Sequence, residues 1–120
     1  MAPNPLPKYI YKISPTPPPQ PIPAEYPLSE LDQKDGFIHF STATQVPQTA
    51  DLFFTSASEL WIMKLELAKW GPAIKWEGEG DGFPHLYGNF GKDDVLSVEK
   101  FEREEGKEWS VAMTTSSWLE

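Results

Sequence analysis

The sequence predicts a single α+β domain, and three observations lead to this expectation. The chain has 120 residues, which is the usual size of one domain with one core. Seven Phe, five Trp and four Tyr residues supply large apolar side chains for that core. Short alternating segments typical of strands are separated by two helix start signals. We therefore expect residues 1–120 to form one domain of mixed helices and strands.

A proline-rich segment, residues 14–27, lies near the beginning of the chain. Ten of the thirteen prolines precede residue 28. Proline lacks the backbone N–H that a regular helix or a central strand uses, so this segment should be extended or polyproline II. We interpret it as a stiff strap laid over the fold, because it lies between two structured parts. The alternative, a ligand for a proline-binding partner domain, stays open.

A strand and a short helix are predicted on either side of this strap. Residues 8–13 are rich in aromatic and β-branched side chains, as strands are. Ser29 and Asp32 have the spacing of a capping box, in which a hydroxyl and an acid satisfy free amides at a helix start. Gly36 is suited to end that helix.

Residues 37–41 alternate between core and polar positions, as in a half-buried strand. Ile38 and Phe40 share one face, which should meet the core. The other face holds Phe37, His39 and Ser41. His39 is therefore expected on the side of the sheet opposite the core.

The main helix should begin near Thr42, which repeats the capping-box spacing with Gln45. A loop is expected over residues 55–58. Apolar residues recur at helical spacing between these points, at Val46, Ala50, Phe53 and Phe54.

The second half of the chain is predicted to be mainly strand. Residues 73–77 should place Lys75 and Glu77 on one face, opposite Ile74 and Trp76. The glycine-rich residues 78–82 should form a turn. Further strand candidates are residues 59–65, 95–98 and 109–112, and residues 99–105 should be a solvated charged segment.

The charge balance disfavours general nucleic-acid binding. The formal net charge is −8, whereas affinity for the phosphate backbone comes from clustered Lys and Arg. Arg103 is the only arginine and lies within an acidic run. Bidentate phosphate recognition by guanidinium groups is therefore scarce.

The absence of cysteine excludes disulfides, thiolate metal sites and a cysteine nucleophile, and it fits a reducing compartment. No stretch approaches the about 20 apolar residues that cross a bilayer, and the first residues do not resemble a secretion signal. We expect a cytoplasmic protein without membrane contact.

Two histidine motifs form the candidate functional centre, residues 35–42 (DGFIHFST) and 83–88 (FPHLYG). His39 would be a ligand-facing group, or a strand histidine that donates to a backbone carbonyl. His85 would join it, or stabilise a proline turn by packing on Trp76. Two histidines without a third nitrogen, a thiolate or an adjacent acidic cluster make a poor zinc site, so no metal is expected.

The polar residues around the histidines also have two interpretations. Glu77 would belong to this centre, or would be a solvent-facing acid paired with Lys75 or Lys64. Ser41 and Thr42 would cap the main helix, or the free amides at that helix start would receive an anionic group. Ser41 lacks the surroundings of a hydrolase nucleophile.

Taken together, these motifs resemble the domain-of-unknown-function family numbered 952. The resemblance covers most of the chain and departs from it at residues 14–27, where a proline run replaces a short helical segment. The residues that carry it are Tyr11-Lys12-Ile13, residues 35–42, Gln45 with Thr49, Ala50 and Phe53, Lys75-Trp76-Glu77 and residues 83–88.

The resemblance implies the ADP-ribosylation-like fold of ADP-ribosyltransferases, a split β-sheet that holds NAD or a related nucleotide in a cleft. It implies His39 and Glu77 as catalytic residues, because the oxocarbenium-like transition state needs a fixed carboxylate beside it. His39 with Ser41 or Thr42 would orient the ribose, and Tyr87 or Tyr11 would stack on nicotinamide. The implied ligand-binding residues are Tyr11, Ser41, Thr42, Gln45, His85 and Tyr87. The order of these residues along the chain differs from the usual His, Tyr, Glu order of the transferases.

Two functions are therefore carried forward. The first is a domain that binds a small nucleotide-like ligand in a His-lined cleft, with an ADP-ribosyltransferase-like activity. The second is a non-enzymatic protein-interaction module that uses the strap or an exposed aromatic surface near Trp109 and Trp118.

Overall fold

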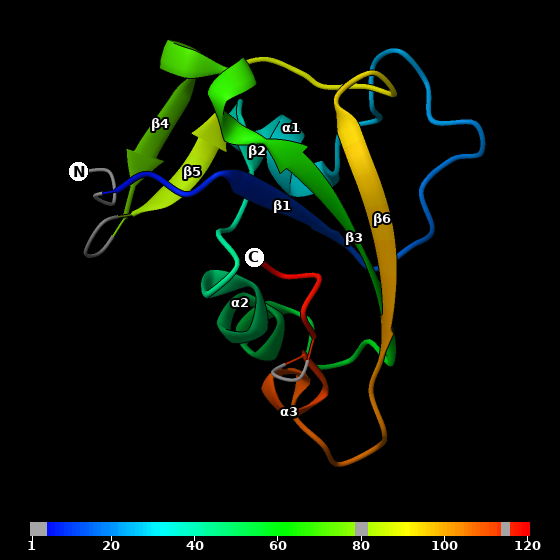
Figure 1. The fold of residues 1–120 in the computed structure, drawn as a ribbon. Helices are drawn as coiled ribbons and strands as arrows, with labels where there is room; N and C mark the ends of the chain where they lie inside the picture. Colours follow the sequence, from blue (N-terminus) through cyan, green and yellow to red (C-terminus); the bar gives the residue numbers. More distant parts are fainter. Residues whose placement is uncertain (1–4, 79–81, 114–115) are drawn as a thin grey trace.

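Six strands form two antiparallel sheets, and three α-helices flank them (Figure 1). The computed structural model describes residues 5–78, 82–113 and 116–120. The first sheet has the order β1-β3-β6, and the second has the order β2-β5-β4. These strands are β1 (Tyr9–Ser14), β2 (Ile38–His39), β3 (Glu59–Glu66), β4 (Ile74–Glu77), β5 (Phe83–Leu86) and β6 (Val95–Glu102). The helices are α1 (Glu30–Asp35), α2 (Gln45–Phe53) and α3 (Trp109–Met113), with short 3-10 turns at Leu67–Lys69 and Gly71–Ala73. The prediction of one small α+β domain is confirmed.

Strands β1 and β3 of the first sheet are buried on both faces, because their alternate residues enter two different cores. Ile10 and Met63 face a core shared with the second sheet. Tyr11 and Ile62 face a core shared with α2 and α3. In Figure 1 the first sheet accordingly lies between the second sheet and the helices α2 and α3. An isolated bridge between Tyr11 and Ser41 connects β1 to the chain just after β2.

The first helix forms as the sequence predicts at both ends. The Ser29 side chain accepts a hydrogen bond from the Asp32 backbone N–H, and Gly36 ends the helix in the left-handed region at φ 80°. The acid of the predicted capping box has another use, however, because the Asp32 carboxylate is directed at Lys12 and His39.

The second helix buries a narrower stripe than its sequence predicts. Val46 and Ala50 are buried and Phe54 is half-buried, at i, i+4 and i+8. Phe53 is 74% exposed, so its assignment to the apolar stripe is wrong. The i+4 steps rotate the buried stripe gradually around the helix and leave residue 53 at its side.

Residues 109–112 form a helix and not the predicted strand. The Asp51 carboxylate on α2 accepts hydrogen bonds from the backbone N–H groups of Trp109 and Ser110, which caps α3 from another element. The Trp109 indole donates to the Phe54 carbonyl and is completely buried. Capping from a distant residue determines this helix, and local composition does not show it.

Residues 83–86 form strand β5, where the sequence suggested a proline turn. Pro84 pairs with Trp76 of β4, and its carbonyl accepts a hydrogen bond from Phe40. Pro84 lacks an N–H, and the side on which an N–H would lie faces the chain beyond the end of the two-residue strand β2. Proline is therefore tolerated in this central strand, against the usual expectation.

Residues 14–27 contain neither helix nor strand beyond the last residue of β1, as expected of a strap. The end of this segment is attached to residues 89–92. Tyr26 donates its N–H to the Phe90 carbonyl at 2.7 Å, and the two rings stack at 4.8 Å. Lys92 donates its N–H to the Pro23 carbonyl at 3.0 Å.

Candidate functional site

The pairing of β2 with β5 brings the two histidines together. His39 and His85 are direct partners in this antiparallel pair. Their ring centroids lie 5.1 Å apart, with an interplanar angle of 71°. The predicted alternation holds, since Ile38 and Phe40 are buried while the His39 side chain keeps 29% exposure.

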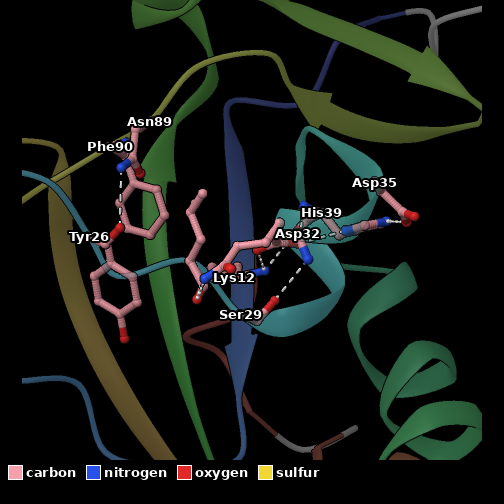
Figure 2. Close-up of polar contacts among 10 residues, drawn as sticks. Lys12, Tyr26, Ser29, Asp32, Asp35, His39, Asn89 and Phe90 are labelled. Carbon is pink, nitrogen blue, oxygen red and sulfur yellow. Dashed lines mark hydrogen bonds and ion pairs between the residues drawn. The ribbon is translucent and has the colours of Figure 1, made fainter.

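A carboxylate faces each nitrogen of the His39 ring (Figure 2). Nδ1 lies 2.6 Å from Oδ1 of Asp32, and Nε2 lies 3.1 Å from Oδ2 of Asp35. The His39 backbone N–H also donates to Asp32, at 3.2 Å. Both acids belong to α1, so the helix and the tight turn at Gly36 position the ring.

Lys12 of β1 completes this arrangement from the core side. Its ammonium donates to Asp32 Oδ2 at 2.7 Å and to the His39 carbonyl at 3.2 Å. The Lys12 side chain is 11% exposed and that of Asp32 is 2% exposed. Burial lowers the pKa of Lys12, an effect that the neighbouring Asp32 charge opposes. Burial alone would raise the pKa of Asp32, but the Lys12 charge and the hydrogen bonds from His39 and Lys12 hold that pKa below its ordinary value.

The second imidazole has an acid partner of its own. Glu77 Oε1 lies 2.9 Å from His85 Nδ1 and accepts a hydrogen bond from the Tyr87 hydroxyl at 2.9 Å. These bonds, first that from His85 and then that from Tyr87, lower the pKa of Glu77. Loss of hydration, followed by the bond to Glu77, raises the pKa of Tyr87. An ionised Glu77 therefore faces a neutral Tyr87 at ordinary pH.

Phe37 provides the aromatic centre of the cluster. Its ring centroid lies 4.5 Å from that of His85, 4.9 Å from that of His39 and 5.1 Å from that of Tyr87. The Lys75 ammonium lies over the Tyr87 ring at 4.9 Å. We call these residues, Phe37, His39, His85, Glu77 and Tyr87 with Asp32, Asp35 and Lys12, the histidine cluster.

Each of the two histidines and Glu77 has specific side-chain partners. The ring of His39 meets carboxylates and no backbone carbonyl. The ring of His85 contacts Phe37 and His39. Glu77 is bonded to His85 and Tyr87, while Lys64 pairs with Glu120.

Within the described residues, no hydrogen bond joins Gln45, Ser41 or Thr42 to either imidazole. The Gln45 side chain accepts from the Thr42 N–H and donates to the Gly82 carbonyl, so it joins the start of α2 to the start of β5. The Thr42 carbonyl accepts hydrogen bonds from the N–H groups of Gln45 and Val46, although α2 begins at Gln45 and Thr44 is its N-cap. Its hydroxyl meets that of Thr44, and Ser41 is 4% exposed.

Tyr11 is not brought to the cluster. Its side chain is fully buried in the core shared with α2 and α3. The ring meets Trp118 edge-on at 5.5 Å, and the hydroxyl accepts the Glu120 N–H at 2.8 Å. Only its backbone contacts the site region, through paired hydrogen bonds with Ser41.

Sequence reasoning missed Lys12, Asp32 and Phe37. Lys12 lies on the same face of β1 as the buried Ile10. A charged residue at such a core position indicates a buried partner. Asp32 was assigned wholly to a helix cap. Phe37 lies on the same strand face as His39. Only the polar residues of that face were assigned a role.

A hollow of about 300 Å³ lies elsewhere, between the end of α2 and the start of α3. Asp51, Thr55, Arg103 and Trp109 line it, and none belongs to the histidine cluster. Three carbonyls, those of Thr55, Ala57 and Lys107, already accept hydrogen bonds from Arg103.

The described ranges contain neither a metal-binding group of side chains nor a membrane-spanning helix. No group of three or more His, Asp or Glu side chains is arranged to hold a metal ion within residues 5–78, 82–113 and 116–120. In the same part of the chain no helix has the length and apolar content to cross a bilayer.

Comparison with known proteins shows a family and structures of a similar protein. Two structures of protein CC0527 from Caulobacter crescentus are similar to this chain. The X-ray structure has a TM-score of 0.68 and 28% identity, covering 81% of this chain and 89% of that one. The solution NMR structure has a TM-score of 0.63 and 27% identity, covering 81% and 87%. No curated protein matches the chain. The family described as Protein of unknown function (DUF952) matches residues 21–98, which is more than half of the sequence, and the chain belongs to this family.

Proposed function

We propose that the histidine cluster binds a nucleotide-like ligand, with NAD or ADP-ribose as the first candidates, and that it performs an ADP-ribosyltransferase-like reaction. The two three-stranded sheets would then correspond to the split sheet of those enzymes. The observation that carries the proposal is the 5.1 Å approach of two imidazoles, each with a carboxylate at Nδ1.

This pairing supports acid–base chemistry. At His85 the Glu77 carboxylate holds the proton on Nδ1, so Nε2 is left to face the reacting partner. His85 Nε2 has no hydrogen-bond partner among the residues that the structure describes, which suits it to accept a proton from a ligand hydroxyl. Glu77 keeps 46% side-chain exposure and is placed to meet a positive charge on the ligand.

The aromatic side chains support a ligand with a flat ring. The Phe37 ring contacts both imidazoles, and its centroid lies 5.1 Å from that of Tyr87. Tyr87 is 41% exposed, so its ring is accessible from solvent. A planar base or nicotinamide would stack on such a surface.

Titration of the full chain with NAD, ADP-ribose, AMP and nicotinamide tests the proposal, with the imidazole signals followed by NMR. We expect shifts at His39 and His85, and their loss in His85→Gln. Glu99→Gln, on β6 in the other sheet, is the control and should bind as the wild type does. The proposal is refuted if no compound shifts the NMR signals of either imidazole. The reaction itself is tested by release of nicotinamide from NAD, which Glu77→Gln should abolish.

A protein-interaction module is the second candidate, and a specific observation favours it. Leu52 and Phe53 at the end of α2 are 73% and 74% exposed, and Val111 on the adjoining α3 is 59% exposed. Trp109 does not contribute, since it is buried, and Trp118 packs on Tyr11 and Phe101. This alternative is supported if Phe53→Ser abolishes self-association, measured by light scattering, without any change at the histidines.

A further inference from the structure

The two carboxylates on His39 differ in how firmly they are held. Asp32 is buried, and it accepts hydrogen bonds from the Lys12 ammonium and the His39 N–H as well as from the ring. Replacing Asp32 at Nδ1 would strand a buried charge. Asp32 is therefore a permanent part of the site.

Asp35 has none of this support. It is the last residue of α1, and its side chain is 34% exposed. The His39 ring is its one ion-pair partner among the described residues, with Nε2 at 3.1 Å. A side chain added at the following Gly36 would meet nothing within 4 Å, so space surrounds this corner. Asp35 can leave Nε2 without uncovering buried polar groups.

We propose that His39 Nε2 is an oxyanion-binding position, and that Asp35 holds this position as an internal substitute which the ligand oxyanion displaces. The proposal rests on the proposed function, because it concerns the same cluster. The Asp35 carboxylate makes the contact that a ligand phosphate or carboxylate oxygen would make. Asp32 and Lys12 compensate each other's charge, so a His39 ring that carries a proton on both nitrogens can donate from Nε2 to one further anion.

The competition is expected to be weak enough for a ligand to overcome. A partly exposed ion pair such as that of Asp35 and His39 is modest, and an interaction of that strength lowers ligand affinity by about fivefold at most. Removing the Asp35 charge should therefore strengthen oxyanion binding by about three- to fivefold.

The test compares wild type, Asp35→Asn and Asp35→Ser as full chains. Inorganic phosphate, acetate and ADP-ribose are titrated separately, and the His39 ring signals are followed by NMR. We expect about three- to fivefold tighter binding in both variants. Glu102→Gln removes the same charge on β6, in the other sheet, and should leave the affinities unchanged.

The three probes separate the possible outcomes. Tighter phosphate than acetate binding identifies the oxyanion as a phosphate, and the reverse identifies a carboxylate. Equal affinity of each probe for wild type and both Asp35 variants overturns the proposal. Stronger phosphate binding in the variants, with no response to ADP-ribose in any protein, supports the oxyanion position and refutes the nucleotide ligand.

Discussion

His39 and His85 lie opposite each other in neighbouring strands, and their rings approach to 5.1 Å between centroids. The two rings differ in their supports. His39 is held from α1 and β1, through buried Asp32 and Lys12. His85 is held by Glu77 at the exposed end of β4. This difference separates the effects of substitutions on stability from their effects on binding.

His39→Ala and Glu77→Ala should both abolish the ligand response, but only the first should destabilise the domain. His39→Ala removes hydrogen bonding from the buried Asp32 carboxylate and should lower the free energy of unfolding by about 2 kcal/mol. Glu77→Ala should leave the melting temperature unchanged, because Glu77 is exposed. Urea and thermal unfolding measure these effects. Unfolding of the Glu77 variant would make that residue structural.

Lys12 and Asp32 should behave as one unit in a double-mutant cycle. Lys12→Met or Asp32→Asn alone leaves a buried charge without its partner, and each should destabilise the domain by about 3 kcal/mol. The double variant should be more stable than the sum of the two losses predicts, because neither charge remains. Urea unfolding at neutral pH provides the values. Additive losses would show that the two side chains do not interact.

Acid should weaken the domain through Asp32. Its folded-state pKa is lower than the ordinary value of 3.8, so its contribution to stability is complete above that pH and is lost as the pH falls below it. The difference in free energy of unfolding between wild type and Asp32→Asn should therefore shrink below pH 3.8. A difference that stays constant with acidification would contradict the depressed pKa.

The attachment of the strap should depend on Gly91. A Cβ at this position would overlap the carbonyl of Ala24, so Gly91→Ala should displace the strap and destabilise the domain by about 2 kcal/mol. Limited proteolysis within residues 14–27 should become faster. Gly88→Ala is the matched control, since its Cβ would meet only Leu86 at 3.8 Å. Equal proteolysis of the two variants would show that the strap does not rely on this contact.

Local pattern was enough to predict much of the frame around the site. The alternation over residues 37–41 correctly placed His39 away from Ile38 and Phe40. The alternation over residues 73–77 likewise placed Glu77 opposite the buried Ile74. The signals at Ser29 and Gly36 marked both ends of α1. These features depend on neighbouring residues, whose spacing determines face and cap.

Tertiary structure alone decided which distant groups meet. The register of β2 against β5 set His39 opposite His85, and a shift by one residue would have turned one ring to the other face. The Asp32 carboxylate does not form the predicted cap, because it binds the Lys12 ammonium on β1 and the His39 ring. Residues 109–112 likewise have a composition typical of a strand, but they form a helix because Asp51 on α2 caps its first backbone N–H groups. The sequence by itself determined which residues of the strands over 37–41 and 73–77 face the core, and where α1 begins and ends. Buried charges and free amides found their partners only when the chain had folded, since the free energy of satisfying them depends on groups far away along the chain.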